Sequence, residues 1–355
     1  MKSLIPRFAR GFAIAASAGL GIALTLSALA QGVLPSAAPV PADNPMTPAK
    51  IELGKKLYFD KRLSRVGTES CNSCHNLMLN GTDNRPVSEG FHGQLGGRNA
   101  PTVFNAAFHS VQFWDGRAAT LEDQAKGPIG NPVEMGMPNG GGPEVVKRVK
   151  EIPGYVPEFK KVFGGSDPVT FDNIAKAIAT FERTLITPNS PYDRFVKGDK
   201  KALSPAAQRG VKLVQSEGCV TCHSGALFNG PKEPIGTGFY MKFPTYTNNL
   251  YVKKYDLEAD LGRYAATKNP ADKHMWKVQS WRNIAITAPY FHNGSVRSLP
   301  EAVRVMAATQ LDKKLTDQQV TDIVAFFNSL TGELPVIAMP LLPETPGTTV
   351  TNEAR

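Results

Sequence analysis

One pattern with a specific chemistry occurs twice in this chain of 355 residues. The pattern C-x-x-C-H uses every cysteine: the first copy holds Cys71, Cys74 and His75, and the second holds Cys219, Cys222 and His223. In c-type haem attachment the two thiols form thioethers to the porphyrin, and the adjacent histidine binds the iron. The sequence therefore predicts two covalently bound c-type haems, each with this histidine as a ligand.

Two other readings of the pattern fit less well. A structural zinc site can use Cys and His, but its ligand pairs usually lack a repeated Cys-His step and lie closer together. A thioredoxin-like redox pair needs no following histidine and expects a βαβ context, which this sequence does not suggest. Two haems remain the prediction.

The N-terminal segment has the pattern of a secretory signal peptide. Lys2, Arg7 and Arg10 precede an apolar run over residues 11–29, and Ala28 and Ala30 form a small-x-small cleavage site. We expect cleavage after residue 30, with an uncleaved membrane anchor as the alternative. Together with c-type haems, this segment predicts a periplasmic protein.

The charge balance argues against nucleic-acid binding. The formal net charge is +9, and it falls to +6 when the three cations of the signal segment are removed. The remaining positive charges are scattered, without a basic run or a platform of aromatic and basic residues. We therefore expect no nucleic-acid partner.

The spacing of the two motifs predicts two domains. Histidines 75 and 223 lie 148 positions apart, and about 325 residues follow the signal segment. We expect a signal peptide at 1–30, an extended lead-in at 31–46, and a Pro-rich tail at 333–355. Between them, we expect an N-terminal haem domain at 47–188 and a C-terminal haem domain at 189–332.

Helical patterns must position these motifs. Apolar periodicity and capping residues predict helices over 47–59 and 172–183, one that opens at Ser204 before the second motif, and one capped by Thr316. Gly/Pro-rich connections at 128–143 and 229–244 predict long loops wrapped around a cofactor. The fold class is therefore mainly α, with two cytochrome c-like domains, long irregular loops and little strand.

The motifs between and after the haem sites resemble those of the bacterial dihaem cytochrome c peroxidases. They occur in the order Gly90-Phe91-His92-Gly93, Arg98-Asn99-Ala100-Pro101-Thr102, Phe113-Trp114-Asp115-Gly116-Arg117, Val133-Glu134-Met135-Gly136 and Ala288-Pro289-Tyr290-Phe291-His292-Asn293-Gly294. The resemblance covers nearly the whole mature chain, and the ordered set is more specific than any single motif.

This resemblance implies roles around the first haem. His92, in a glycine-flanked loop, would be the distal iron ligand of the oxidised form, released after the second haem is reduced. Glu134 would handle peroxide protons, since a carboxylate in an apolar pocket can have a raised pKa, and Gln124 would be a hydrogen-bonding partner in the distal pocket. Trp114 would assist electron transfer between the haems.

The resemblance also implies ligands in the second half. Met306 would bind the second iron opposite His223, with Met275 as an alternative; Met241 and His274 are further candidates by residue type. His292 would tune this haem rather than bind its iron. A calcium ion between the haem domains would be held by Asn99, Thr287 and Pro289, the last two through backbone oxygens.

The implied function is reduction of hydrogen peroxide to water by a periplasmic enzyme that takes electrons from a small cytochrome c or a cupredoxin. The family also implies a homodimer. One alternative is a related enzyme that matures tryptophylquinone, which uses Tyr at the second haem and lacks a distal histidine at the first. Another is an electron-transfer cytochrome without peroxidase activity, which would need no distal pocket.

Overall fold

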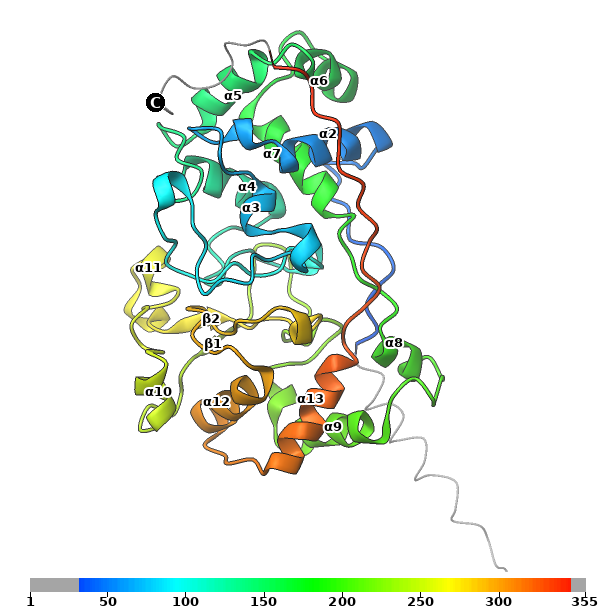
Figure 1. Ribbon diagram of the computed structural model, residues 1–355, viewed down its shortest axis with the longest axis vertical. Helices are drawn as coiled ribbons and strands as arrows, with labels where there is room; N and C mark the ends of the chain where they lie inside the picture. The colour runs from blue at the N-terminus through cyan, green and yellow to red at the C-terminus, as the bar shows by residue number, and fades with distance from the viewer. Residues whose placement is uncertain (1–31, 346–355) are drawn as a thin grey trace, which may run out of the picture. The chain divides into compact units, whose positions relative to one another are not determined.

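The computed structural model describes residues 32–345, and the predicted signal peptide lies outside this range. The described part is mainly helical and contains two strands of three residues each. This confirms the expectation of a mainly α fold with little strand. Figure 1 shows two groups of helices with the strands and long connections between them.

The first group holds the helices of the N-terminal half: α2 (Pro48–Phe59), α3 (Cys71–Cys74), α4 (Leu121–Gly130), α5 (Gly142–Lys150), α6 (Tyr155–Phe163) and α7 (Phe171–Glu182). The second group follows: α8 (Pro191–Val196), α9 (Pro205–Ser216), α10 (Leu250–Lys254), α11 (Tyr264–Thr267), α12 (Leu299–Leu311) and α13 (Asp317–Asn328).

Short 3₁₀ turns fill many of the connections: η1 (Lys61–Leu63), η2 (Leu77–Leu79), η3 (Phe91–Gly93), η4 (Ala106–Phe108), η5 (Cys219–Thr221), η6 (Pro270–Asp272) and η7 (Ile284–Ile286).

The four helices expected from the sequence are confirmed, because their start signals act as predicted. The Thr47 hydroxyl accepts the Lys50 N–H at 3.2 Å at the start of α2, and Ser204 caps α9 in the same way. Thr316 forms a capping box with Gln319 at the start of α13. The start of α7 differs from the expected position by one residue.

Each haem motif follows a helix that crosses a later helix at a glycine. Helix α2 packs on α7, and α9 packs on α13. A Cβ at Gly54 would collide with the carbonyl oxygen of Ala177, and a Cβ at Gly210 would collide with that of Asp322. Only glycine permits so close a backbone approach. In each half, the helix that precedes the motif is thus positioned by a close helix crossing at a glycine.

Apolar side chains fill the two groups differently. The first has a continuous core around the α2–α7 pair that includes the fully buried Tyr58, Phe159 and Ile178. In the second, aromatic rings gather where α13 meets the segment after the second motif: Trp281 stacks on Phe228 with ring centroids 5.3 Å apart. Both cores lie beside a C-x-x-C-H motif and hold it in place.

The expected long connections contain more regular structure than predicted. Residues 128–130 complete α4 and residue 142 begins α5, so the first loop is shorter than the expected 128–143. Strand β1 (Tyr240–Lys242) lies within the second loop and pairs antiparallel with β2 (Met275–Lys277). Tyr240 lies opposite Lys277 in this register.

The C-terminal segment is irregular, as expected, but it is anchored. After α13 it runs back along the molecule to the first group of helices (Figure 1). There the Arg62 guanidinium donates to the carbonyl of Pro343 at 3.0 Å, and Arg62 itself is paired with the buried Asp60. This segment therefore links the two groups of helices.

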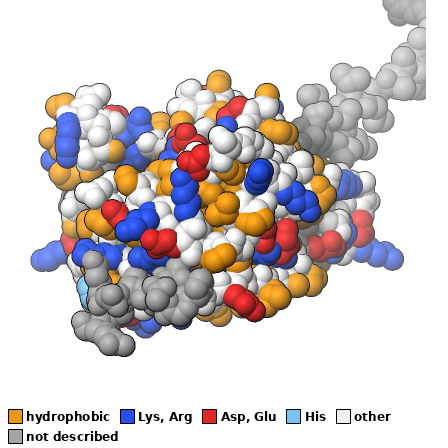
Figure 2. All heavy atoms as spheres, turned by 90° about the horizontal axis from the view of Figure 1, so that it is seen from above, with side chains coloured by type: hydrophobic (Ala, Val, Ile, Leu, Met, Phe, Trp, Pro, Cys, Tyr) orange, Lys and Arg blue, Asp and Glu red, His pale blue; other side chains and the backbone are white. Residues whose placement is uncertain are grey.

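Within residues 32–345, no helix combines the length and apolar character that crossing a membrane requires. On the face seen in Figure 2, basic and acidic side chains are interspersed. This pattern agrees with the scattered charges of the sequence and shows no single-sign patch on that face.

Candidate functional site

The first motif lies on α3 and its C-cap His75, which follow α2 and η1 along the chain. His75 Nδ1 lies 2.9 Å from the carbonyl oxygen of Pro101, and the Tyr58 hydroxyl donates to the His75 carbonyl at 2.6 Å. When Nδ1 carries the proton and donates to Pro101, Nε2 keeps its lone pair for a metal. The fold thus leaves Nε2 of His75 available for a metal, as the sequence prediction requires.

The second motif is held by an equivalent contact. His223 Nδ1 lies 2.8 Å from the carbonyl oxygen of Phe228, and its ring stacks on Trp281 with centroids 4.4 Å apart. Gly218, at φ 89°, makes the turn from α9 into η5. Both motif histidines therefore share one orienting device, which the sequence pattern does not reveal.

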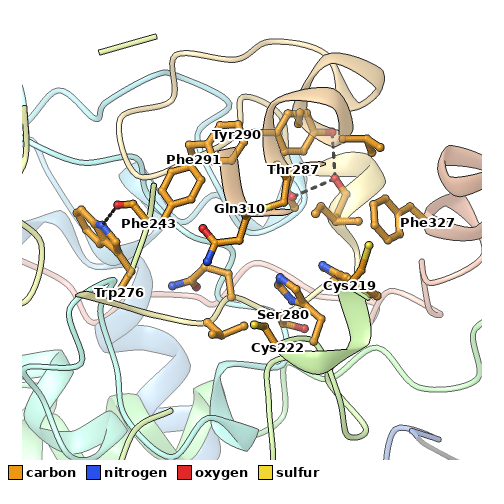
Figure 3. A pocket seen from close by; sticks show the side chains of 18 of the residues that line it. Cys219, Cys222, Phe243, Trp276, Ser280, Thr287, Tyr290, Phe291, Gln310 and Phe327 are labelled. Carbon is orange, nitrogen blue, oxygen red and sulfur yellow. Dashed lines mark hydrogen bonds between the residues drawn. The ribbon is translucent and has the colours of Figure 1, made fainter. Parts of the chain in front are cut away.

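A cavity of about 260 Å³ opens on the second motif. Cys219, Cys222 and His223 line it, and α12 contributes Met306 to the same lining. Figure 3 shows both cysteines projecting from one helical turn into the space that Thr287 and Gln310 also face. The cavity thus joins the attachment motif to the residue expected to be the opposite ligand.

Only two of the four other candidate ligands of the second iron lie in this cavity. Met241 and His292 also line this cavity, whereas His274 and Met275 are not among its lining residues. His274 Nδ1 lies 3.1 Å from the carbonyl oxygen of Asp260. Geometry therefore favours Met306 over Met275 but leaves Met241 as a competitor.

The walls of this cavity fit a haem. They are largely apolar and aromatic, yet two buried polar atoms, His292 Nε2 and Gln310 Oε1, have no hydrogen-bond partner. Burial lowers the pKa of His292 to about 4, so its imidazole is neutral. Cys219 and Cys222 form no disulfide. An apolar pocket lined by two cysteines and an oriented imidazole suits covalent haem, and its unpartnered polar atoms suit a bound group with polar substituents.

Trp114 lies in an aromatic group at the wall of the same cavity. Its Nε1–H donates to the Asn99 carbonyl at 2.9 Å, and its ring lies edge-on to Trp276 at 6.4 Å and to His292 at 6.5 Å. Trp276 stacks on His292 at 4.3 Å. The stacking of Trp276 on His292 was not predicted, because Trp276 stands out in the sequence only as one of three tryptophans.

The three expected calcium ligands, Asn99, Thr287 and Pro289, line this cavity too. The Asn99 amide donates through Nδ2 to the Arg85 carbonyl at 2.8 Å, which leaves Oδ1 for a cation. The Asn99 N–H donates to the His292 carbonyl at 2.7 Å. The structure thus brings these residues to one cavity, with an oxygen of the type calcium prefers.

The surroundings of the first motif are different. A hollow of about 570 Å³ is lined by Ser73 of α3 and, across it, by Gly90, His92 and Gly93. His92 is exposed and adopts φ 54°, a left-handed conformation uncommon for a residue other than glycine. The expected distal ligand therefore lies on an open loop beside the motif.

This loop is joined to the segment that carries Glu134. The Phe91 N–H lies 3.0 Å from the Val133 carbonyl and 2.8 Å from the Glu134 carbonyl. A Cβ at Gly90 would collide with the Val133 carbonyl oxygen, so the two segments approach as closely as glycine allows. The His92 loop and the Glu134 segment are therefore in direct backbone contact.

The environment of Glu134 shifts the pKa of its carboxyl group. Burial raises its pKa above the usual range, against the opposing effects of the Arg117 charge and a hydrogen bond from Asn131. Gln124 lies half-buried on α4, which leads into the Glu134 segment. Both residues thus lie on one continuous piece of chain. Burial raises the pKa of Cys74 to about 11, and the charges of Asp83 and Glu134 add to that rise.

The comparisons with known proteins agree with this geometry. The family described as "Di-haem cytochrome c peroxidase" matches residues 48–201. The chain is 45% identical over 311 residues to the cytochrome c551 peroxidase of Pseudomonas aeruginosa, covering 86% of this chain and 85% of that protein. It is 43% identical over 329 residues to the cytochrome c551 peroxidase of Nitrosomonas europaea, covering 91% and 93%. The chain belongs to the di-haem cytochrome c peroxidase family.

A solved structure supports the fold assignment. A MauG-like protein associated with microbial copper homeostasis aligns with a TM-score of 0.73 and 29% identity, covering 91% of this chain and 99% of that one. Membership in the di-haem cytochrome c peroxidase family implies two haems and an oxidoreductase that acts on peroxide. The resemblance inferred from the sequence motifs is thereby confirmed.

Proposed function

We propose that this protein reduces hydrogen peroxide to water, with one covalent haem at each C-x-x-C-H motif. The observation that carries the proposal is the inequality of the two motif surroundings. The second motif opens on an apolar cavity that contains Met306. The first contributes Ser73 to a hollow that His92 also lines, and the His92 loop is hydrogen-bonded to the segment of the half-buried acid Glu134. A simple electron carrier needs neither the loop nor the acid.

At the first site, His75 and His92 are the proposed iron ligands in the oxidised form. When bound, the two haems supply electron transfer and cleavage of the peroxide bond. Glu134 would take a proton from one peroxide oxygen and return it to the other, a role that its raised pKa suits. Gln124 orients the peroxide by hydrogen bonding.

At the second site, His223 and Met306 are the proposed ligands. A thioether ligand raises the haem potential, which suits a site that receives electrons. Trp114 offers an aromatic route from this site toward the first one, and its contact with Asn99 holds the ring in place. Asn99 Oδ1 and the backbone oxygens of Thr287 and Pro289 are the proposed calcium ligands.

The proposal includes the setting of the enzyme. The mature chain begins after residue 30 and acts in the periplasm as a homodimer, with haem domains at 47–188 and 189–332. Its donor is a small cytochrome c or a cupredoxin. The tryptophylquinone-maturing branch is the rival, and the thioether at position 306 and the histidine at position 92 argue against it.

Turnover with peroxide tests the proposed function. The oxidised protein, given one electron equivalent and then peroxide with a reduced c-type cytochrome, should oxidise that donor rapidly. If His92 is a releasable ligand, the fully oxidised protein should react much more slowly. Absence of donor oxidation in both states, with two haems confirmed by mass, would reject the proposed activity.

Replacement of Met306 with histidine tests the second ligand. Exchange of a thioether for an imidazole should lower the potential of the second haem and remove the absorption band of thioether-ligated ferric haem. A redox titration followed by visible absorption measures both. Met241→His is the matched control, because Met241 lines the same cavity. Loss of the band in the Met241 variant alone would transfer the assignment to Met241.

A further inference from the structure

A buried lysine lies in the wall of the second cavity without an anionic partner. Lys277, at the end of β2, is 7% exposed. Its Nζ lies 2.8 Å from His109 Nδ1 and 3.2 Å from Gln279 Oε1, and all three residues line the cavity. Among the described residues, no Asp or Glu oxygen lies within ion-pair distance of this ammonium group.

Arg282, a second buried cation of the same cavity, has the carboxylate partner that Lys277 lacks. Arg282 also lines the cavity, but its guanidinium is paired with Asp193 at 2.9 Å and donates to the Ala226 carbonyl at 2.8 Å. A buried charge is costly unless it is paired and hydrogen-bonded. Burial alone lowers the pKa of Lys277 to about 7. Lys277 thus differs from Arg282 in having two neutral acceptors and no counter-ion.

We propose that Lys277 and His109 form a carboxylate-binding site for a propionate group of the second haem, and that the Lys277 charge raises the reduction potential of that haem. The inference rests on the proposed attachment of this haem at Cys219 and Cys222. A haem brings two carboxylates into the cavity that Lys277 lines, and a positive charge nearby favours the reduced form, which carries one more electron.

The site also joins the two halves of the chain. His109 follows η4 in the N-terminal half, whereas Lys277 belongs to β2. The Lys277 N–H donates to the Trp114 carbonyl at 2.9 Å, so the lysine is fixed to the segment of the proposed relay tryptophan. A propionate bound here contacts residues from both halves. Lys277 is therefore a positioning residue that sets a potential, not a catalytic one.

The test is a spectroelectrochemical titration of the holoprotein carrying Lys277→Met, which keeps the apolar stem and removes the charge. The equilibrium constant for reduction of the second haem should fall about tenfold or more, equivalent to about 59 mV for one electron, and the first haem should change much less. Propionate-bending modes in the resonance Raman spectrum of the second haem should shift as well. Lys277→Arg should restore most of the potential.

Lys242→Met is the matched control, because Lys242 lies on the neighbouring strand β1 but is exposed, where solvent screens its charge. An unchanged potential and unchanged Raman modes in Lys277→Met with both haems present would overturn the inference, as would an equal shift in Lys242→Met. If methionine prevents haem loading, Lys277→Gln decides by the same criteria. Failure of the wild-type protein to carry two covalent haems would instead count against the proposed function.

Discussion

Replacing Glu134 with glutamine is expected to lower peroxide turnover by about 10²- to 10⁴-fold, the usual contribution of a positioned acid–base group. Glutamine keeps the size of the side chain and its capacity for hydrogen bonds, but it cannot accept and return a proton. Both haem spectra and the two potentials should stay as in the wild type. The measurement is steady-state oxidation of a reduced c-type cytochrome by peroxide.

The pH dependence sharpens this prediction. Glu134 acts first as a base, so the wild-type rate should fall as the pH drops toward its pKa. Because burial raises that pKa, the fall should begin at a higher pH than for an exposed carboxyl group. The glutamine variant should lose this limb of the profile. An unimpaired Glu134→Gln enzyme would remove Glu134 from the mechanism.

A control variant separates chemistry from general effects. Glu151 lies at the end of α5 and is exposed. Glu151→Gln removes the same charge from the surface of the same group of helices and should leave turnover within about twofold, because exposed charges interact weakly through water. A comparable loss in both variants would indicate that net charge, not proton transfer, controls the rate.

Replacing Asp193 with alanine is expected to lower the free energy of unfolding by about 3–5 kcal/mol, the cost of breaking a buried ion pair. The side chains of Asp193 and Arg282 are 0% and 1% exposed. Asp193 also accepts the backbone N–H groups of Leu34 and Ser190 at 3.1 Å and 3.0 Å. Its loss would leave a buried, unpaired guanidinium beside the second cavity. We therefore expect the surroundings of the second haem to unfold at lower denaturant than those of the first.

Denaturant unfolding of the holoprotein, followed by absorption of each haem, measures this effect. The transition of the second haem should move to lower denaturant by more than that of the first. Asp167→Ala is the matched control, because Asp167 pairs with Lys150 at 2.8 Å on the surface, with 67% and 40% of the side chains exposed. Such a pair contributes about 0–1 kcal/mol. Equal shifts in the two variants would contradict the importance assigned to the buried pair.

Local signals were strong enough to predict the four helices α2, α7, α9 and α13, but not α12, which carries Met306. The α2 and α13 boundaries follow from Thr47 and Thr316, because a hydroxyl at an N-cap satisfies backbone N–H groups that the helix leaves open. The sequence predicted a loop where strand β1 lies. A three-residue strand forms because of its pairing with β2, and its own residues carry too little pattern to predict it. The sequence also did not predict that Arg62 binds the C-terminal segment through the Pro343 carbonyl.

The features of the candidate site also fall into those that the sequence predicted and those that only the structure revealed. The sequence by itself determined the two C-x-x-C-H motifs, since attachment chemistry requires those residues at that spacing, and its ordered motifs identified the family. Only the tertiary structure revealed the carbonyl groups that orient His75 and His223, the stacking of Trp276 on His292, and the unpaired Lys277 facing His109. These contacts join residues up to 168 positions apart. Apart from the contact between His223 and Phe228, five positions apart, they depend on which distant segments meet in space, and no local spacing in the chain encodes that.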